Sequence, residues 1–160
     1  MHTFFKDGST ALHNAATTGL VESVRLLIEH GTNVTIRNND GSTALHNAAT
    51  TGLVESVRLL IENGTDVTIR NNEGRTALHN AARKDQVDVV QILIENGCDI
   101  YLPDSDGDSP LHIAAKNNSP QIVRYLLNTD CDPNIINTKT NKASDSAAFA
   151  ILTEENCLCT

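Results

Sequence analysis

The sequence predicts an all-α repeat solenoid, and three observations lead to that prediction. The segment STALHNAATTGLVESVRLLIE occurs at Ser9–Glu29 and again, without a substitution, at Ser42–Glu62. Four glycines followed by similar text (GSTALHNAA twice, then GRTALHNAA and GDSPLHIAA) recur every 33 residues, at Gly8, Gly41, Gly74 and Gly107. Apolar residues inside each copy have helical spacing. A fixed period of this size indicates stacked units, none of which can bury its apolar face alone.

Each repeat is predicted to hold a short helix followed by a longer one. In the second repeat, Thr43 is a candidate N-cap, and the small and apolar residues of Ala44–Ala49 form one stripe. Gly52 is placed to end this helix, because glycine tolerates the left-handed backbone of a helix C-terminus. Val54–Ile61 has the spacing of a second helix, which Gly64 would end.

The connecting residues are predicted from turn and capping chemistry. The pairs Asn63-Gly64 and Asn96-Gly97 follow amphipathic segments, so they are expected to cap helices instead of forming hairpin turns. Ser109-Pro110 is an N-cap followed by a first-turn proline. Three polar residues replace expected glycines, and they should tolerate a left-handed backbone: Asp85, Asn118 and Asp130.

The whole chain, residues 1–160, is predicted to be one domain. Its repeats cover about 8–40, 41–73, 74–106 and 107–139, and a degenerate, truncated unit at 140–160 is expected to cap the stack. Repeat one is a near copy of an internal repeat and not a polar cap. We therefore expect that the chain is a fragment or that a partner covers its first helices.

The motif Thr-Ala/Pro-Leu-His-x-Ala-Ala, the 33-residue period and a Gly-x-Asp before the next turn resemble the ankyrin repeat over roughly Asp7 to Cys159. The resemblance implies helix–loop–helix units with projecting β-hairpins. It also implies a protein partner bound on the concave face, which hairpin tips and the ends of the first helices build in that family.

Composition excludes several functional classes. The formal net charge is −8, from 12 basic and 20 acidic residues, which disfavours contact with nucleic acid and with anionic membrane surfaces. The chain has neither an apolar run long enough to span a bilayer nor a recognisable secretory signal. A cytoplasmic protein is expected, with the nucleus as the other compartment.

We predict no catalytic residues, no metal site and no cofactor. Four histidines recur at one register, but neighbouring helices lie about 8–10 Å apart and zinc requires each nitrogen at about 2 Å. The resemblance implies instead that these histidines link hairpins to helices: His13, His46, His79 and His112. Cys98 and Cys131 also occupy equivalent positions of neighbouring repeats. The distance between such positions, about 8–10 Å, exceeds the Cα separation of about 7 Å that a disulfide allows, so both are expected to be reduced core fillers.

The last four residues, Cys157-Leu158-Cys159-Thr160, match the C-a-a-X pattern, which makes Cys157 a candidate for lipidation. Thr is not a favoured final residue, and no polybasic run provides a second membrane anchor.

Carrying the resemblance across by register gives the candidate partner-binding residues. They are Arg37, Asn39, Asp40, Arg70, Asn72, Glu73, Arg75, Arg83, Lys84, Asp106, Asp108 and Lys116. Arg70, Arg75 and Arg83 are predicted to be the anchors, because arginine is enriched at binding hot spots. Alanine at these three positions is expected to weaken binding with little change in melting temperature.

The predicted function is therefore non-catalytic protein binding by an adaptor, a scaffold or an inhibitor. One alternative is a lipid-anchored or secreted effector-type ankyrin protein. Another is the ankyrin fragment of a longer enzyme or receptor chain. The partner and the oligomeric state are not encoded in any motif.

Overall fold

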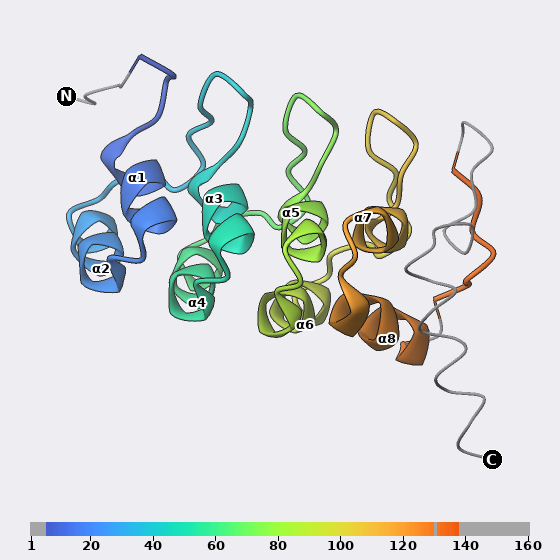
Figure 1. Ribbon diagram of the computed structural model, residues 1–160. Helices are drawn as coiled ribbons and strands as arrows, with labels where there is room; N and C mark the ends of the chain where they lie inside the picture. The colour runs from blue at the N-terminus through green and yellow to red at the C-terminus, as the bar shows by residue number, and fades with distance from the viewer. Residues whose placement is uncertain (1–5, 130, 138–160) are drawn as a thin grey trace.

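The computed structural model describes residues 6–129 and 131–137, which hold eight α-helices in four consecutive pairs (Figure 1). The helices are α1 (Ala11–Thr18), α2 (Val21–Glu29), α3 (Ala44–Thr51), α4 (Val54–Glu62), α5 (Ala77–Arg83), α6 (Val87–Glu95), α7 (Pro110–Lys116) and α8 (Pro120–Asn128). The predicted helices over Ala44–Ala49 and Val54–Ile61 are confirmed as α3 and α4.

The four pairs stand side by side in a two-layered row (Figure 1). The shorter, odd-numbered helices contact one another in sequence and form one layer, and the longer, even-numbered helices form the second. A loop projects from the odd-numbered layer ahead of each first helix. The predicted repeat solenoid is therefore confirmed, and the loops lie in register because the units do.

The helix ends follow the predicted capping chemistry. Thr43 caps α3 in extended conformation, and Gly52 ends it at a φ of 75°. Asp85 and Asn118, which replace glycine in later repeats, have φ values of 55° and 54°. The Asp85 carboxylate also accepts a hydrogen bond from the backbone N–H of Ile122, at 3.1 Å, in the first turn of α8. An aspartate at this turn thus stabilises the start of a helix in the next repeat.

The projecting loops differ from the predicted β-hairpins. Between residues 6 and 129 they contain turns and no strand. The loops before α3, α5 and α7 have backbone bonds across their own turns, such as Asn71 N–H to Arg75 O at 2.8 Å. The tips are also joined to the preceding loop: Asn39 N–H to Asp7 O at 3.0 Å, Asn72 N–H to Asp40 O at 2.9 Å, and Ser105 N–H to Glu73 O at 2.9 Å. Backbone groups are therefore paired both within a loop and between repeats.

The apolar core runs along the row between the two layers. Each first helix contributes one leucine that is almost fully buried, at Leu12, Leu45, Leu78 and Leu111. Alanines on the same helices are buried as well, and they let neighbouring helices approach closely. The core therefore consists of small and aliphatic side chains, as the scarcity of aromatic residues predicts.

Identical residues differ in burial between the first two repeats. Leu26 is 46% exposed, whereas Leu59, at the same position of the same segment, is 8% exposed. Ala11 is exposed, whereas Ala44 is buried. Repeat two has a neighbour on its N-terminal side and repeat one has none among the described residues.

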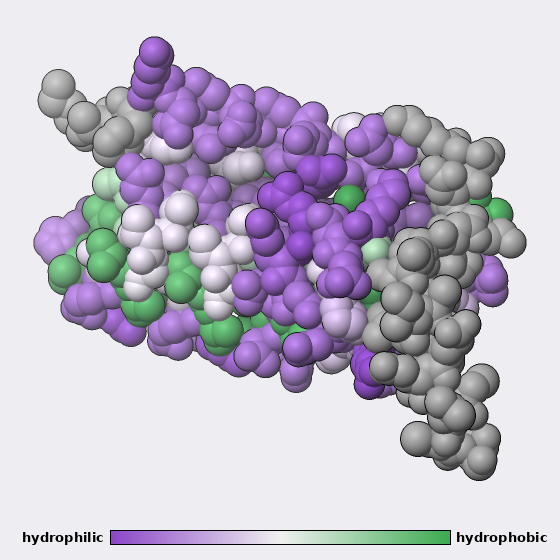
Figure 2. Space-filling view, viewed as in Figure 1, coloured by the Kyte–Doolittle hydropathy of each residue, from purple (hydrophilic) through white to green (hydrophobic). Residues whose placement is uncertain are grey.

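The open end of repeat one is hollowed and apolar. Its groove, between α1 and α2, has a volume of about 620 Å³ and includes Leu20 and Leu26 among its lining residues. Figure 2 shows the apolar surface that gathers at this end of the molecule. The expectation that repeat one carries no polar cap is confirmed. The predicted C-terminal capping unit at 140–160, with Cys157, and the backbone of Asp130 lie outside the described residues.

Candidate functional site

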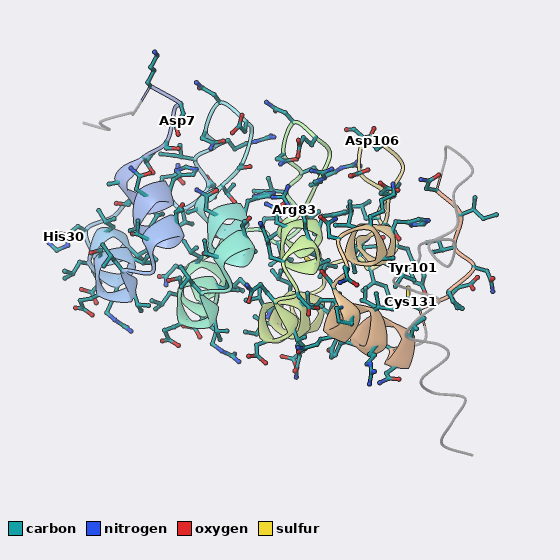
Figure 3. All side chains as sticks on the ribbon, in the orientation of Figure 1. Asp7, His30, Arg83, Tyr101, Asp106 and Cys131 are labelled. Atoms are coloured by element: carbon teal, nitrogen blue, oxygen red, sulfur yellow. The ribbon has the colours of Figure 1, made fainter. Side chains whose placement is uncertain are left out.

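The candidate binding residues lie on one surface, which we call the loop face. It consists of the projecting loops before α3, α5 and α7 together with the C-terminal ends of these three helices. Figure 3 shows Asp106 on the loop before α7 and Arg83 at α5. One polar pocket on this face is lined by residues of α3, α5 and the loops before them, so these four elements form a continuous part of the surface.

Two of the predicted arginines join neighbouring loops. The Nε of Arg37 donates to Gly41 O at 2.8 Å, and its Nη2 donates to Arg70 O at 2.7 Å. Arg70 repeats the pattern, with Gly74 O at 2.8 Å and Pro103 O at 2.7 Å. Each guanidinium therefore supports its own turn and the next loop, and its donors are directed along the row.

Arg75 forms the best-buried ion pair of the surface. Its Nε lies 3.0 Å from Oδ2 of Asp104, and its Nη1 lies 2.6 Å from Oε2 of Glu73. The Asp104 side chain is only 1% exposed. Its other oxygen accepts the backbone N–H groups of Asp106 and Asp108, so the carboxylate is fully enclosed by donors.

Asp108 and Lys116 also hold each other. The Asp108 carboxylate accepts from Nζ of Lys116 and, at 2.8 Å, from the side-chain amide of Asn137, which follows α8 in the same repeat. Burial raises the pKa of Asp108, but the hydrogen bonds from Lys116 and Asn137 outweigh it and lower that pKa below its usual value. Both residues were predicted to face a partner, and the structure uses them to connect the last described loops.

The exposed members of the predicted set are found at the loop tips and on α5. Asn39, Asp40, Asn72, Glu73, Asp106 and Lys84 are all exposed. The side-chain amide of Asn72 donates to Asn39 O at 2.9 Å, which fixes the spacing of two tips. The tips therefore present polar side chains from a backbone that its neighbours hold in place.

Arg83 is the one predicted anchor whose charge has no partner among the described residues. It is the last residue of α5, it makes no ion pair with any described residue, and its buried Nε has no hydrogen-bond partner there. It lines a pocket with a volume of about 380 Å³ on the loop face. The other lining residues are Asp40, Ser42, Asn47, Thr50, Asn71, Asn72, Glu73 and Asn80.

Three asparagines that line this pocket are not among the residues predicted from the sequence: Asn47, Asn71 and Asn80. Asn47 lies on α3 and Asn80 on α5, each one residue after the recurring histidine. Asn14 occupies the same register in repeat one, and this recurrence of a polar residue on an otherwise apolar helix is the signal that could have identified them.

The recurring histidines are buried structural links, as the resemblance implies. In His46, Nδ1 accepts the backbone N–H of Thr43 at 3.2 Å, so Nε2 carries the proton that is donated to Arg75 O at 3.1 Å. His13 and His79 make equivalent bonds to Ser42 O and Leu102 O. Burial lowers the pKa of His46 to about 4 and also lowers that of His79. Both ring nitrogens are thus occupied by local hydrogen bonds.

The cysteines in the described part of the chain are unpaired and buried. Burial raises the pKa of the Cys98 thiol to about 12 and that of Cys131 to about 11. Cys98 Sγ lies 3.2 Å from Val67 O in the preceding repeat. Such thiols are core fillers with little thiolate character, as predicted.

Within residues 6–129 and 131–137, no three side chains from His, Cys, Asp and Glu come together in a way that could hold a metal ion. None of the eight helices has the length and apolar character to cross a membrane.

The arginine contacts correct one expectation from the sequence. Alanine at Arg70, Arg75 and Arg83 together was expected to leave the melting temperature nearly unchanged. Arg70 and Arg75 hold neighbouring loops together and enclose a buried carboxylate, so the triple variant loses stability as well. Of the three arginines, Arg83 alone has neither an ion pair nor a side-chain hydrogen bond with a described residue, so its substitution should disturb the fold least.

A row of helix pairs with laterally bonded loops and a polar surface defines a non-globular repeat protein of the helical solenoid class. The family model for ankyrin repeats (3 copies) matches residues 1–71 and 64–137. The chain therefore belongs to the ankyrin repeat family, whose repeats are in general protein–protein interaction modules. No curated protein matches the chain significantly.

Proposed function

We propose that the protein is a non-catalytic adaptor, scaffold or inhibitor that binds a protein partner on the loop face, the counterpart of the family's concave face. The observation that supports this most is the lateral bonding of the loops. Their tips are held through Asn39, Asn72 and Ser105, while polar side chains at the tips are exposed. A surface fixed before binding loses little conformational entropy on association.

The charge distribution supports a partner of mixed polarity. Four basic side chains of this face already bond to groups of the protein itself: Arg37, Arg70, Arg75 and Lys116. The positive charge that is available to a partner is therefore smaller than the number of basic residues indicates. The exposed carboxylate of Asp40 and the free charges of Arg83 and Lys84 remain on the face. We place this function in the cytoplasm or nucleus, in agreement with the buried, unpaired Cys98 and Cys131.

Site-specific photo-crosslinking tests the proposed face. The photoreactive amino acid benzoylphenylalanine replaces Asp40 at a loop tip in one variant and Arg58, which is exposed on α4, in the control. After irradiation in extracts of the cells that express the protein, we expect a discrete adduct from position 40 and none from position 58. Adducts of the same mass and yield from both positions, or an adduct from position 58 alone, would contradict binding on the loop face.

A further inference from the structure

The pocket around Arg83 combines one uncommitted cation with two amide acceptors. The amide nitrogen of Asn47 donates to Thr17 Oγ1 at 3.0 Å, and that of Asn80 donates to His46 O at 3.4 Å. These bonds orient both amides, so that the Oδ1 atoms of Asn47 and Asn80 are the groups left to accept hydrogen bonds. Asn80 is only 8% exposed, so its orientation is set by packing as well.

Arg83 is specific to this repeat. The same position is Thr17 in repeat one and Thr50 in repeat two, and each of these hydroxyls bonds to the carbonyl four residues earlier in its helix. In repeat four the position is Lys116, which is paired with Asp108. The third repeat alone places an unpaired guanidinium at this point of the row.

The charge of Arg83 has no partner among the described residues, and Arg83 lines the pocket. A carboxylate in the pocket would pair with that charge, and a hydrogen bond to an ionised acceptor is shorter and stronger than one to a neutral oxygen.

We propose that this pocket binds an aspartate or glutamate side chain from an extended segment of a protein partner. The carboxylate pairs with the guanidinium of Arg83, and the backbone N–H groups of the segment donate to Oδ1 of Asn47 and Asn80. This assignment rests on the proposed function, because it names the chemistry by which the loop face recognises its partner.

The charges at the pocket favour a carboxylate over a phosphate. Asp40 and Glu73 line the pocket with Arg83. Arg75 contacts Glu73 at 2.6 Å, but it also pairs with Asp104, so its single charge compensates only one of these two carboxylates. The charge around Arg83 is therefore already negative. The pocket therefore repels a carboxylate, which carries one negative charge, less than it repels a phosphate dianion.

The test follows the Nε–Hε resonance of Arg83 by NMR in the full chain labelled with ¹⁵N. The probe is the peptide acetyl-Gly-Glu-Gly-amide, with the Gln and phosphoserine peptides as comparisons. The chain itself offers a matched variant, Arg83→Thr, which restores the residue of repeat two, assigns the resonance by its disappearance and removes the binding group. Arg58, exposed on α4, serves as the internal control for nonspecific pairing.

We expect a saturable shift of the Arg83 resonance with the Glu peptide, and binding at least about tenfold weaker with the Gln and phosphoserine peptides. The Glu peptide should also shift the side-chain amide resonances of Asn47 and Asn80, and these shifts should disappear in Arg83→Thr. The assignment is overturned if Arg83 shows no saturable shift up to about 10 mM Glu peptide. It is overturned equally if the Gln or phosphoserine peptide binds as well, or if Arg58 shifts in parallel.

The photo-crosslinking and NMR experiments distinguish a failure of the proposed function from a failure of the carboxylate assignment. If the photo-crosslink from position 40 forms but the Glu peptide does not bind, the loop face is the binding surface and the carboxylate assignment is wrong. If position 58 captures the partner and position 40 does not, the proposed function fails at its own test, whatever the peptide does at Arg83.

Discussion

The variant Arg75→Ser unfolds with a free energy about 3 kcal/mol lower than that of the unmodified protein. The substitution leaves the Asp104 carboxylate, whose side chain is 1% exposed, without the cation that compensates it. Breaking a buried ion pair by removing one partner typically costs about 3–5 kcal/mol. Asp104 retains the N–H groups of Asp106 and Asp108, so we expect the lower end of that range. Chemical denaturation at pH 7 measures the change.

The preceding repeat supplies the control, because Ser42 and Asn71 occupy in it the positions of Arg75 and Asp104. Asn71 Oδ1 accepts the two equivalent backbone hydrogen bonds of its loop, from the N–H groups of Glu73 and Arg75. The double variant Arg75→Ser/Asp104→Asn should therefore recover most of the loss and lie within about 1 kcal/mol of the unmodified protein. Additive losses from the two single variants would show that Arg75 and Asp104 do not act as a pair.

Protonation of His46 produces the second large effect. Its pKa is about 4 in the folded protein because of burial, compared with 6.5 in the unfolded chain. As pH falls, the unfolded chain binds the proton first. The stability is therefore fully present above pH 6.5 and is lost as pH falls towards 4. The shift corresponds to about 3 kcal/mol, and the lowered pKa of His79 adds a loss in the same direction.

The variant His46→Gln isolates this contribution. The unmodified protein should be more stable than the variant at pH 7, and the difference between them should shrink by about 3 kcal/mol as pH approaches 4. Denaturant titrations at several pH values measure it. A difference that stays constant over this range would mean that His46 titrates normally or remains neutral in both states.

The helices and their ends could be predicted because local chemistry determines them. Thr43 and Gly52 flank α3 as the capping preferences require, and Asp85 adopts the left-handed conformation expected of a residue that replaces glycine. The identical segments also made the stack itself predictable, since each copy has an apolar face that only a neighbour can cover.

The roles of the arginines could not be predicted because their partners come from stacking. Arg37 and Arg70 donate to carbonyl groups 33 residues away, and no local pattern distinguishes an arginine directed along the row from one directed outward. The same is true of the backbone bonds that join the loop tips, because they also link residues of neighbouring repeats. Arg83 was predicted as a binding residue, but its pocket depends on Asn47 and Asn80, whose orientation only packing defines.

Leu26 and Leu59 provide the most direct test that neighbouring repeats bury one another. They occupy the same position in two identical segments, and their exposures are 46% and 8%. Leu59→Ala should lower the free energy of unfolding by about 2–3 kcal/mol, and Leu26→Ala by about 1 kcal/mol or less. Equal losses from the two variants would contradict the stacked arrangement, because they would show that the segment itself, and not its neighbour, determines what is buried.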